Sequence, residues 1–254
     1  MRVVHVTYYT DPGSPRSWAA EPALRRVLTR FGDGVSISYV MGGLARRIED
    51  PLRMLRDVLA AAAESAMPVD PRLWLEHPPQ STYPSCLAVK AAAEQGLDVA
   101  FLRRAREGFM CERRTLCRSE ALVDLARTVA GLDVTRFASD LGSDAIVERF
   151  SADLERTRVA AGGRELPFAE VEGTPGLHAV AGLEAAVERA GAAPGGAPPA
   201  LEAALRRFGR MATAEVAVVC ELPGPLAAAE LWRLAAQWKV RSQPSLGGEL
   251  WEPA

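Results

Sequence analysis

The sequence predicts an α/β fold in which a βαβ unit and a later β-hairpin are separated by a large helical block. β-type residues fill positions 2–10 and return at 35–40, with a helical pattern between them. A nearly continuous helical pattern then runs from about residue 45 to 160, and β-type residues reappear at 166–172. Because a strand, a crossover helix and a second strand form a right-handed unit, the first two strands should be parallel.

The first strand ends at a loop that contains two prolines, Asp11–Pro15. The β-branched and aromatic residues before this loop are typical of a buried strand. Ser14 is predicted to cap the helix that follows, and Pro15 suits the first helical position, where its missing N–H costs nothing. Apolar residues then recur at helical spacing up to Phe31, and a Gly-Asp-Gly turn leads into the second strand.

The last part of the chain divides into three predicted pieces. The hairpin pairs 166–172 with 177–181 around a Gly-Thr-Pro-Gly turn and leads into a helix, which completes a domain of residues 1–190 with its helical insertion at about 45–160. Residues 191–199 are rich in Ala, Gly and Pro and form a predicted linker. Residues 200–254 show three helices and a Gly-Gly turn, which predicts a winged-helix-like module.

Composition excludes several classes of function. A formal net charge of −2 argues against a dominant nucleic-acid or anionic-membrane partner. No segment approaches the ~20 apolar residues of a membrane span, and the N-terminus lacks the pattern of a secretory signal. The four cysteines form no CxxC, and the three histidines lie far apart, so we expect a cytoplasmic protein without a metal site.

Three short stretches carry a resemblance to a known family. They are Asp11–Trp18, Tyr39–Leu44 and Tyr83–Ala92. In order and spacing they resemble the DsbA-like branch of the thioredoxin superfamily, especially the cytoplasmic proteins related to FrnE and to the protease adaptor YjbH. The resemblance covers about residues 1–190 and implies a thioredoxin-like fold.

The resemblance also implies which residues occupy the family's redox site. The Cys-Pro-x-Cys pair falls on Ser14 and Ser17, so both redox cysteines are replaced by serine. The family's cis-proline, which faces the redox site, falls on Pro167, whereas Pro175 fits better as a turn residue. Disulfide exchange requires a thiolate that attacks sulfur, and a serine hydroxyl cannot replace it. We therefore expect no disulfide exchange at this site.

A helix N-terminus that favours anions would remain at this site without the thiols. We predict a non-redox binding or adaptor protein that holds a protein partner or a thiol-containing small molecule in a groove between the Ser14 helix tip and Pro167. The candidate ligand-binding residues are Ser14, Arg16, Ser17, Trp18, Leu166 and Pro167. A purely structural role for Ser14, as the helix cap alone, and a core position for Trp18 stand beside this prediction.

An enzymatic alternative comes from the same loop. Ser14-Pro15-Arg16-Ser17-Trp18 also resembles the Ser-Pro-x-Ser-Trp signature of kappa-class glutathione transferases and related isomerases. That resemblance implies that Ser14 is catalytic and holds the thiolate of glutathione, which would then be the cofactor. No other cofactor is expected, and the sequence leaves open whether any catalysis remains.

The predicted C-terminal module carries six Lys or Arg and six Asp or Glu between residues 200 and 254. A groove-binding protein normally neutralises several phosphates, so nucleic acid is a poor partner and a DNA-binding sensor is the weakest hypothesis. We predict a protein-interaction or homodimerisation element, in which Trp232, Trp238 and Trp251 supply contact area.

Two further groups of residues have structural explanations. Arg103, Arg104 and Arg106 are typical of a solvated helix face. A disulfide between Cys111 and Cys117 is left open as an alternative to free thiols.

Overall fold

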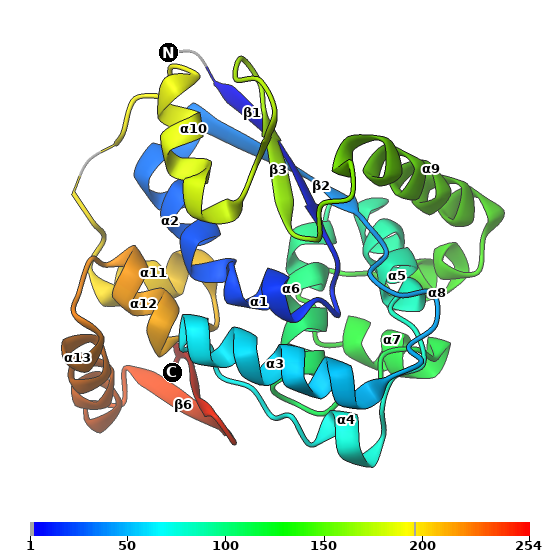
Figure 1. Ribbon diagram of the computed structural model, residues 1–254. Coiled ribbons are helices and arrows are strands. Elements are labelled where there is room, and N and C mark those ends of the chain that lie inside the picture. The colour runs from blue at the N-terminus through cyan, green and yellow to red at the C-terminus, as the bar shows by residue number, and fades with distance from the viewer. Residues whose placement is uncertain (1–2, 196) are drawn as a thin grey trace.

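The computed structural model describes residues 3–195 and 197–254 (Figure 1). Residues 1, 2 and 196 lie outside this description, and residue 196 falls within the predicted linker. The first sheet has the strand order β2-β1-β3-β4. Its strands are β1 (Val4–Thr10), β2 (Val35–Met41), β3 (Phe168–Val171) and β4 (Leu177–His178). β1 and β2 are parallel, whereas β3 is antiparallel to both β1 and β4, so the predicted βαβ unit and hairpin are confirmed.

The crossover between β1 and β2 consists of two consecutive helices, where the sequence pattern indicated one. α1 (Pro15–Ala19) ends at Ala20, and α2 (Glu21–Phe31) begins directly after it and leads into the 3-10 turn η1 (Gly32–Gly34). α2 packs with α10 (Leu183–Arg189), which follows the short η2 (Val180–Gly182), against apolar side chains of β1 and β3. This core fixes the start of α1 at the end of β1.

The predicted helical block is confirmed between residues 51 and 161, where it contains seven helices instead of the four that the apolar pattern distinguished. These are α3 (Pro51–Ser65), α4 (Leu73–Glu76), α5 (Tyr83–Ala93), α6 (Asp98–Met110), α7 (Ser119–Ala126), α8 (Val134–Leu141) and α9 (Asp144–Ala161). Their apolar faces share one core that includes Trp74, Phe101 and Phe109, and Trp18 of α1 enters the same core. The block is therefore packed directly against the start of the crossover.

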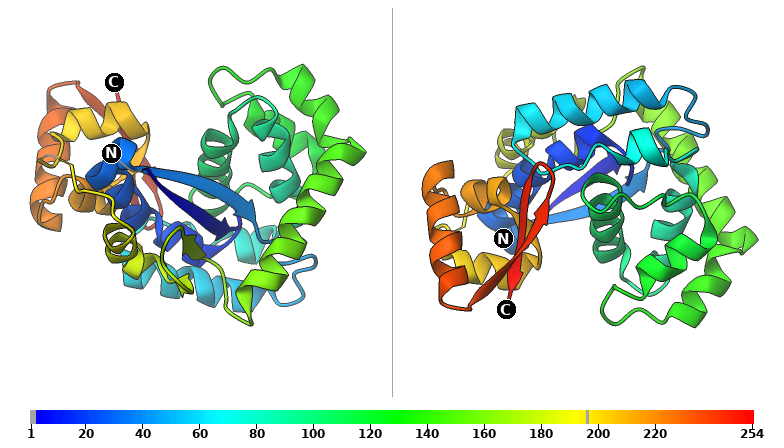
Figure 2. Two further views of the ribbon diagram at one scale, coloured as in Figure 1. Left: turned by 90° about the horizontal axis from the view of Figure 1, so that it is seen from above. Right: turned by 90° about the horizontal axis from the view of Figure 1, so that it is seen from below.

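The C-terminal segment combines three helices with a three-stranded antiparallel sheet of order β5-β7-β6. Its elements are α11 (Leu201–Phe208), β5 (Met211–Ala212), α12 (Thr213–Val219), α13 (Gly224–Ala236), β6 (Val240–Ser245) and β7 (Gly248–Pro253). The helices and the hairpin agree with the sequence pattern, and the domain boundaries and the winged-helix assignment stay predictions. The helices of the segment lie beside α2 (Figure 2).

The tip of the β6–β7 hairpin is packed against the helical block. Ser245 Oγ lies 3.4 Å from the carbonyl oxygen of Cys111, and a Cβ at Gly247 would stand 2.8 Å from the carbonyl oxygen of Val69. Among the tryptophans of the segment, Trp251 is fully buried in its core, whereas Trp232 is half exposed and Trp238 is 87% exposed. Only the latter two are available to a partner.

Candidate functional site

The loop between β1 and α1 is fixed by the buried carboxylate of Asp11. This carboxylate accepts hydrogen bonds from the backbone N–H groups of Gly13 (2.7 Å) and Leu44 (2.6 Å) and from the hydroxyl of Thr82 (2.8 Å). Burial raises the pKa of Asp11, and these hydrogen bonds oppose the rise only in part. A Cβ at Gly13 would come within 2.7 Å of a Thr82 methyl group, so the loop requires glycine there.

Ser14 is the N-cap of α1, as predicted from the sequence. Its Oγ accepts a hydrogen bond from the backbone N–H of Ser17 at 3.2 Å, and Pro15 occupies the first helical position. Ser14 is only 1% exposed, and within the described residues its hydroxyl donates to no acceptor. The cap therefore uses the acceptor capacity of this hydroxyl and leaves its proton uncommitted.

The second serine, Ser17, points into the protein. Its Oγ accepts a hydrogen bond from the hydroxyl of Thr10 at 2.9 Å, and Thr10 in turn accepts one from the guanidinium of Arg106. Trp18 is also buried: its indole N–H donates to the carbonyl of Pro68 at 2.9 Å, and the guanidinium of Arg103 lies 4.5 Å from its ring centroid. Neither residue lines a cavity beside the loop.

Two cavities flank the exposed side chain of Arg16. The larger, of about 690 Å³, is lined by Ser14, Arg16 and Leu166 together with the 42–50 loop and the first turns of α3. The smaller, of about 490 Å³, is lined by Arg16, Pro167 and the second half of α3. The Leu166–Pro167 peptide bond is cis, the isomer that the family resemblance implies. Four of the six predicted residues thus meet around the helix tip, and Ser17 and Trp18 lie beneath it.

The larger cavity has balanced charges. Four guanidinium groups and four carboxylates line it: Arg16, Arg47, Arg53, Arg164, Glu49, Asp50, Asp57 and Glu165. Arg16 forms an ion pair with Glu165, and both side chains are well exposed. Such a lining can hold a polar guest, but it contributes no thiol. Within the described ranges, no group of three or more His, Cys, Asp or Glu side chains is placed to hold a metal ion.

The four cysteines are free thiols, so the alternative disulfide between Cys111 and Cys117 is not formed. Cys86 is nearest to the serine loop, where its thiol donates to Asp11 at 3.2 Å. Burial and the adjacent Asp11 carboxylate raise the pKa of Cys86 well above its usual value, and burial raises that of Cys111 to about 12. Cys86 therefore does not supply the thiolate that Ser14 and Ser17 lack.

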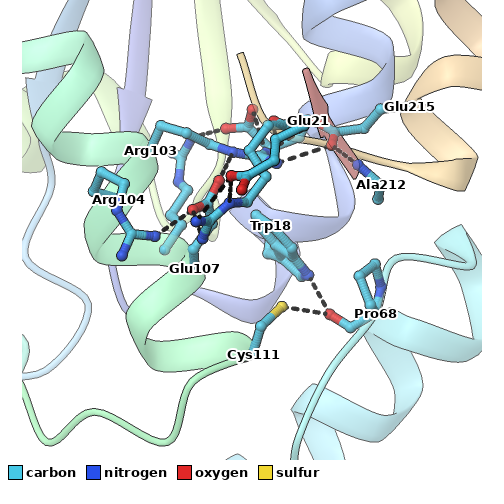
Figure 3. A network of polar contacts seen from close by, with 12 residues as sticks. Trp18, Glu21, Pro68, Arg103, Arg104, Glu107, Cys111, Ala212 and Glu215 are labelled. Atoms are coloured by element: carbon cyan, nitrogen blue, oxygen red, sulfur yellow. Dashed lines mark hydrogen bonds and ion pairs between the residues drawn. The ribbon is translucent and has the colours of Figure 1, made fainter. Parts of the chain in front are cut away.

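A second polar cluster lies beneath α1, and the sequence did not reveal it (Figure 3). The prediction of a solvated face for Arg103, Arg104 and Arg106 is wrong, because all three side chains are at least four-fifths buried. Arg106 pairs with Glu21 and is nearly inaccessible. Arg103 donates to both carboxylate oxygens of Glu215, each at 2.9 Å.

This second cluster, which we call the arginine–glutamate network, joins three parts of the molecule. Its members are Glu21 and Arg25 of α2, Arg103, Arg104, Arg106 and Glu107 of α6, Glu112, and Arg210, Glu215 and Glu252 of the C-terminal segment. Glu215 has no exposed surface; it also forms an ion pair with Arg25 at 3.0 Å and accepts a hydrogen bond from the N–H of Ala212 at 2.6 Å. The network fastens the C-terminal segment to the rest of the chain.

Comparison with known proteins agrees with this geometry. A family model described as thioredoxin matches residues 8–160. The protein named "ClpXP adapter protein SpxH" from Halalkalibacterium halodurans is 28% identical over 96% of this chain and 86% of its own length. The protein of the same name from Bacillus subtilis is 26% identical over 60% of this chain and 53% of its own.

Solved structures show the same fold. A putative protein disulfide isomerase from Nitrosomonas europaea superposes with a TM-score of 0.61 and 16% identity over 82% of this chain and all of its own. The cytosolic disulfide reductase DsbM from Pseudomonas aeruginosa, solved with GSH, gives a TM-score of 0.59 and 20% identity over 73% of this chain and 95% of its own. These values confirm the predicted α/β, thioredoxin-like fold. None of the helices in the described ranges combines the length and the hydropathy needed to cross a bilayer.

Proposed function

Because this chain belongs to the thioredoxin family, in its DsbA-like branch, and carries serine at both redox positions, we propose that it is a non-redox adaptor that brings a protein partner to the ClpXP protease. The observation that carries the proposal is the extent of the similarity to the adapter from H. halodurans. It covers 96% of this chain, including the C-terminal segment that the family model does not reach.

The helix tip supports binding better than catalysis. The cavities around Arg16 offer exposed charged side chains and the backbone of Leu166, both of which suit an extended segment of a partner. Ser14 and Ser17 carry hydroxyl groups where the family has thiols, so a guest bound there cannot exchange disulfides with this site. An adaptor of ClpXP would work in the cytoplasm, in agreement with the compartment expected from the cysteines.

Degradation by purified ClpXP tests the proposal. Candidate clients are proteins whose half-lives lengthen both when this chain is deleted from its host and when ClpX is depleted. Adding the purified chain should accelerate ClpXP-dependent loss of such a client, and omitting ATP should abolish the effect. If no protein meets both criteria, or if the chain leaves the degradation rate unchanged, the adaptor proposal is wrong.

An insulin-reduction assay tests the loss of redox chemistry. With Cys86, Cys111, Cys117 and Cys220 each changed to Ser, the chain should reduce insulin at the rate of buffer alone. The variant Ser14→Cys/Ser17→Cys restores a Cys-Pro-x-Cys sequence at a helix N-terminus, which lowers a cysteine pKa. When the four natural cysteines are changed to Ser, this variant should reduce insulin faster than buffer alone. Activity of the unmodified serine loop would contradict the proposal.

One observation favours the glutathione-dependent alternative: Ser14 lines a cavity and keeps its hydroxyl proton uncommitted. In this alternative the Ser14 hydroxyl would donate to the glutathione thiolate. Titration calorimetry with millimolar glutathione separates the two functions, since the adaptor requires no heat of binding. Heat that disappears in Ser14→Ala, together with transferase or isomerase turnover, would replace the adaptor by an enzyme.

A further inference from the structure

The first sheet has an open edge on β2, away from the serine loop. The backbone N–H of Met41 is directed away from β1, because it donates to the carboxylate of Asp153 on α9 at 2.9 Å. Backbone groups alternate in direction along a strand, so Ile37 and Tyr39 direct their N–H and C=O groups to the same outer edge. In the part of the chain that the structure describes, these four groups have no hydrogen-bond partner.

An open edge of this kind is a template for pairing with another strand, and proteins usually cover it or interrupt it. Here α9 covers only the Met41 end of β2. Figure 2 shows β2 along the side of the sheet that faces the space between the C-terminal segment and the helical block. The edge is therefore flanked by two parts of the molecule, and within the described residues neither part donates to or accepts from the backbone of Ile37 and Tyr39.

A cavity of about 650 Å³ opens beside this edge and is lined by Tyr39 of β2. Its apolar lining comes from three other elements, with Leu28 on α2, Val99 on α6 and Phe208 at the end of α11. Val99 is 50% exposed and adds accessible apolar surface to this cavity. We call this cavity and the adjoining edge at Ile37 and Tyr39 the β2 cleft.

The β2 cleft has one guanidinium group that the arginine–glutamate network does not neutralise. Six arginines line its cavity, and five of them (Arg25, Arg103, Arg104, Arg106 and Arg210) belong to that network, whose five glutamates balance their charge. The sixth is Arg207. Arg207 has no carboxylate partner among the described residues; it donates to the carbonyl of Leu28 at 2.8 Å and lies over the ring of Phe208. The exposed guanidinium group of Arg207 can therefore pair with a carboxylate of a ligand.

We infer that the β2 cleft binds an extended, acidic segment of the protein partner, which pairs as an additional strand with Ile37 and Tyr39. This inference rests on the proposed adaptor function and names a second contact for its client, separate from the cavities around Arg16. The unpaired backbone groups favour a polypeptide as the ligand, Arg207 favours an acidic side chain, and the valine and phenylalanine provide apolar contacts. Nucleic acid lacks the backbone donors and acceptors that would complete the sheet.

Fluorescence anisotropy with a labelled peptide of alternating valine and glutamate, as long as β2, tests the inference. A peptide with lysine in place of glutamate is the charge control. Arg207→Glu and Val99→Asp should each raise the Kd of the acidic peptide about tenfold, equivalent to about 1.4 kcal/mol. Ile37→Pro, which removes an outward N–H and no bond to β1, should also weaken binding, with its folding checked by circular dichroism.

Two matched control variants lie outside the β2 cleft. Arg206→Glu makes the same charge change on the neighbouring exposed residue of α11, and Val147→Asp replaces a valine of α9 that is 49% exposed. Both should bind the acidic peptide as the unmodified chain does. Equal binding of the acidic and basic peptides, or equal losses in the cleft and control variants, would overturn the inference. So would an oligonucleotide that binds more tightly than the peptide, or a homodimer that Ile37→Pro dissociates.

The ClpXP assay distinguishes failure of this inference from failure of the adaptor function. If Val99→Asp stimulates client degradation as well as the unmodified chain, the adaptor stands and the β2 cleft is not the client contact. If no variant stimulates degradation while peptide binding follows the cleft substitutions, the cleft stands and the adaptor proposal fails.

Discussion

Asp11 and Glu21 are both buried carboxylates near the start of α1 and α2, yet their surroundings shift their pKa values in opposite directions. Asp11 in the serine loop faces neutral donors, and burial raises its pKa. Burial acts on Glu21 in the same sense, but Arg106, Arg103 and Arg25 together outweigh it and lower the pKa of Glu21. Neutral hydrogen bonds are enough to position a carboxylate, whereas guanidinium groups are needed to keep it ionised in the core.

The same comparison distinguishes the serine loop, which forms the candidate site, from the arginine–glutamate network, which contributes to stability. The hydrogen bonds that hold the serine loop connect neutral groups or one buried acid. The arginine–glutamate network brings α2, α6 and the C-terminal segment together, and several of its charges have almost no access to water. Removing one member of the network leaves other buried charges without a partner. We therefore expect substitutions in the network to lower the free energy of unfolding more than substitutions in the serine loop.

Replacing Glu215 should produce the largest effect. Glu215→Gln removes the negative charge that Arg25 and Arg103 share, and it should lower the free energy of unfolding by about 3–5 kcal/mol. Urea denaturation measures this change. The control is Glu221→Gln, which breaks a half-exposed pair with Arg26 and should cost no more than about 1 kcal/mol. Equal losses in the two variants would mean that the network contributes no more than a surface ion pair.

The opposite pKa shifts predict opposite pH dependences for two variants. The folded-state pKa of Glu21 is lowered, so the stability that Glu21 contributes is present above its unfolded pKa and is lost as the pH falls through the folded value. The advantage of the unmodified chain over Glu21→Gln should therefore shrink on acidification.

For Asp11 the folded-state pKa is raised, so ionisation is less favourable in the folded state and its contribution declines as the pH rises. The unmodified chain should gain stability relative to Asp11→Asn on acidification below the folded pKa of Asp11. Urea midpoints of the three proteins between neutral pH and about pH 3.5 measure both slopes. Slopes of the same sign would show that the two carboxylates do not differ in the way the structure indicates.

The sequence was a good guide to the serine loop because each signal there is local. A cap and a proline at the first helical position lie within Asp11–Pro15, and their geometry follows from short-range sterics and hydrogen bonds. The resemblance also located Pro167, which neither spacing nor composition would have singled out. The βαβ unit and the hairpin followed from periodicity and from the turn residues between the elements.

The arginine–glutamate network could not be predicted in the same way. Three arginines on one helix are typical of a solvated face, and two of the carboxylates that pair with Arg103 and Arg106, Glu21 and Glu215, lie on segments far away in the sequence. Periodicity gives no information on which helix faces another, so burial of Arg103 and Arg106 depends on how α2, α6 and the C-terminal segment pack. Burial of Ser17 and Trp18 depends on the same packing, because the arginines contact Trp18 directly and reach Ser17 through Thr10.

The smallest expected effect concerns Ser14 and decides between a cap and a ligand site. Ser14→Ala removes the acceptor for the Ser17 N–H and should lower the free energy of unfolding by about 1 kcal/mol. Ser143→Ala removes the corresponding cap of α9 and should cost a similar amount in urea denaturation. If Ser14 serves only as a cap, both variants should support ClpXP-dependent degradation equally well once the temperature is set below their unfolding transitions. If the hydroxyl also holds a guest, Ser14→Ala alone should lose that activity or glutathione binding, since the two substitutions are matched in stability and differ only in the cavity that Ser14 lines.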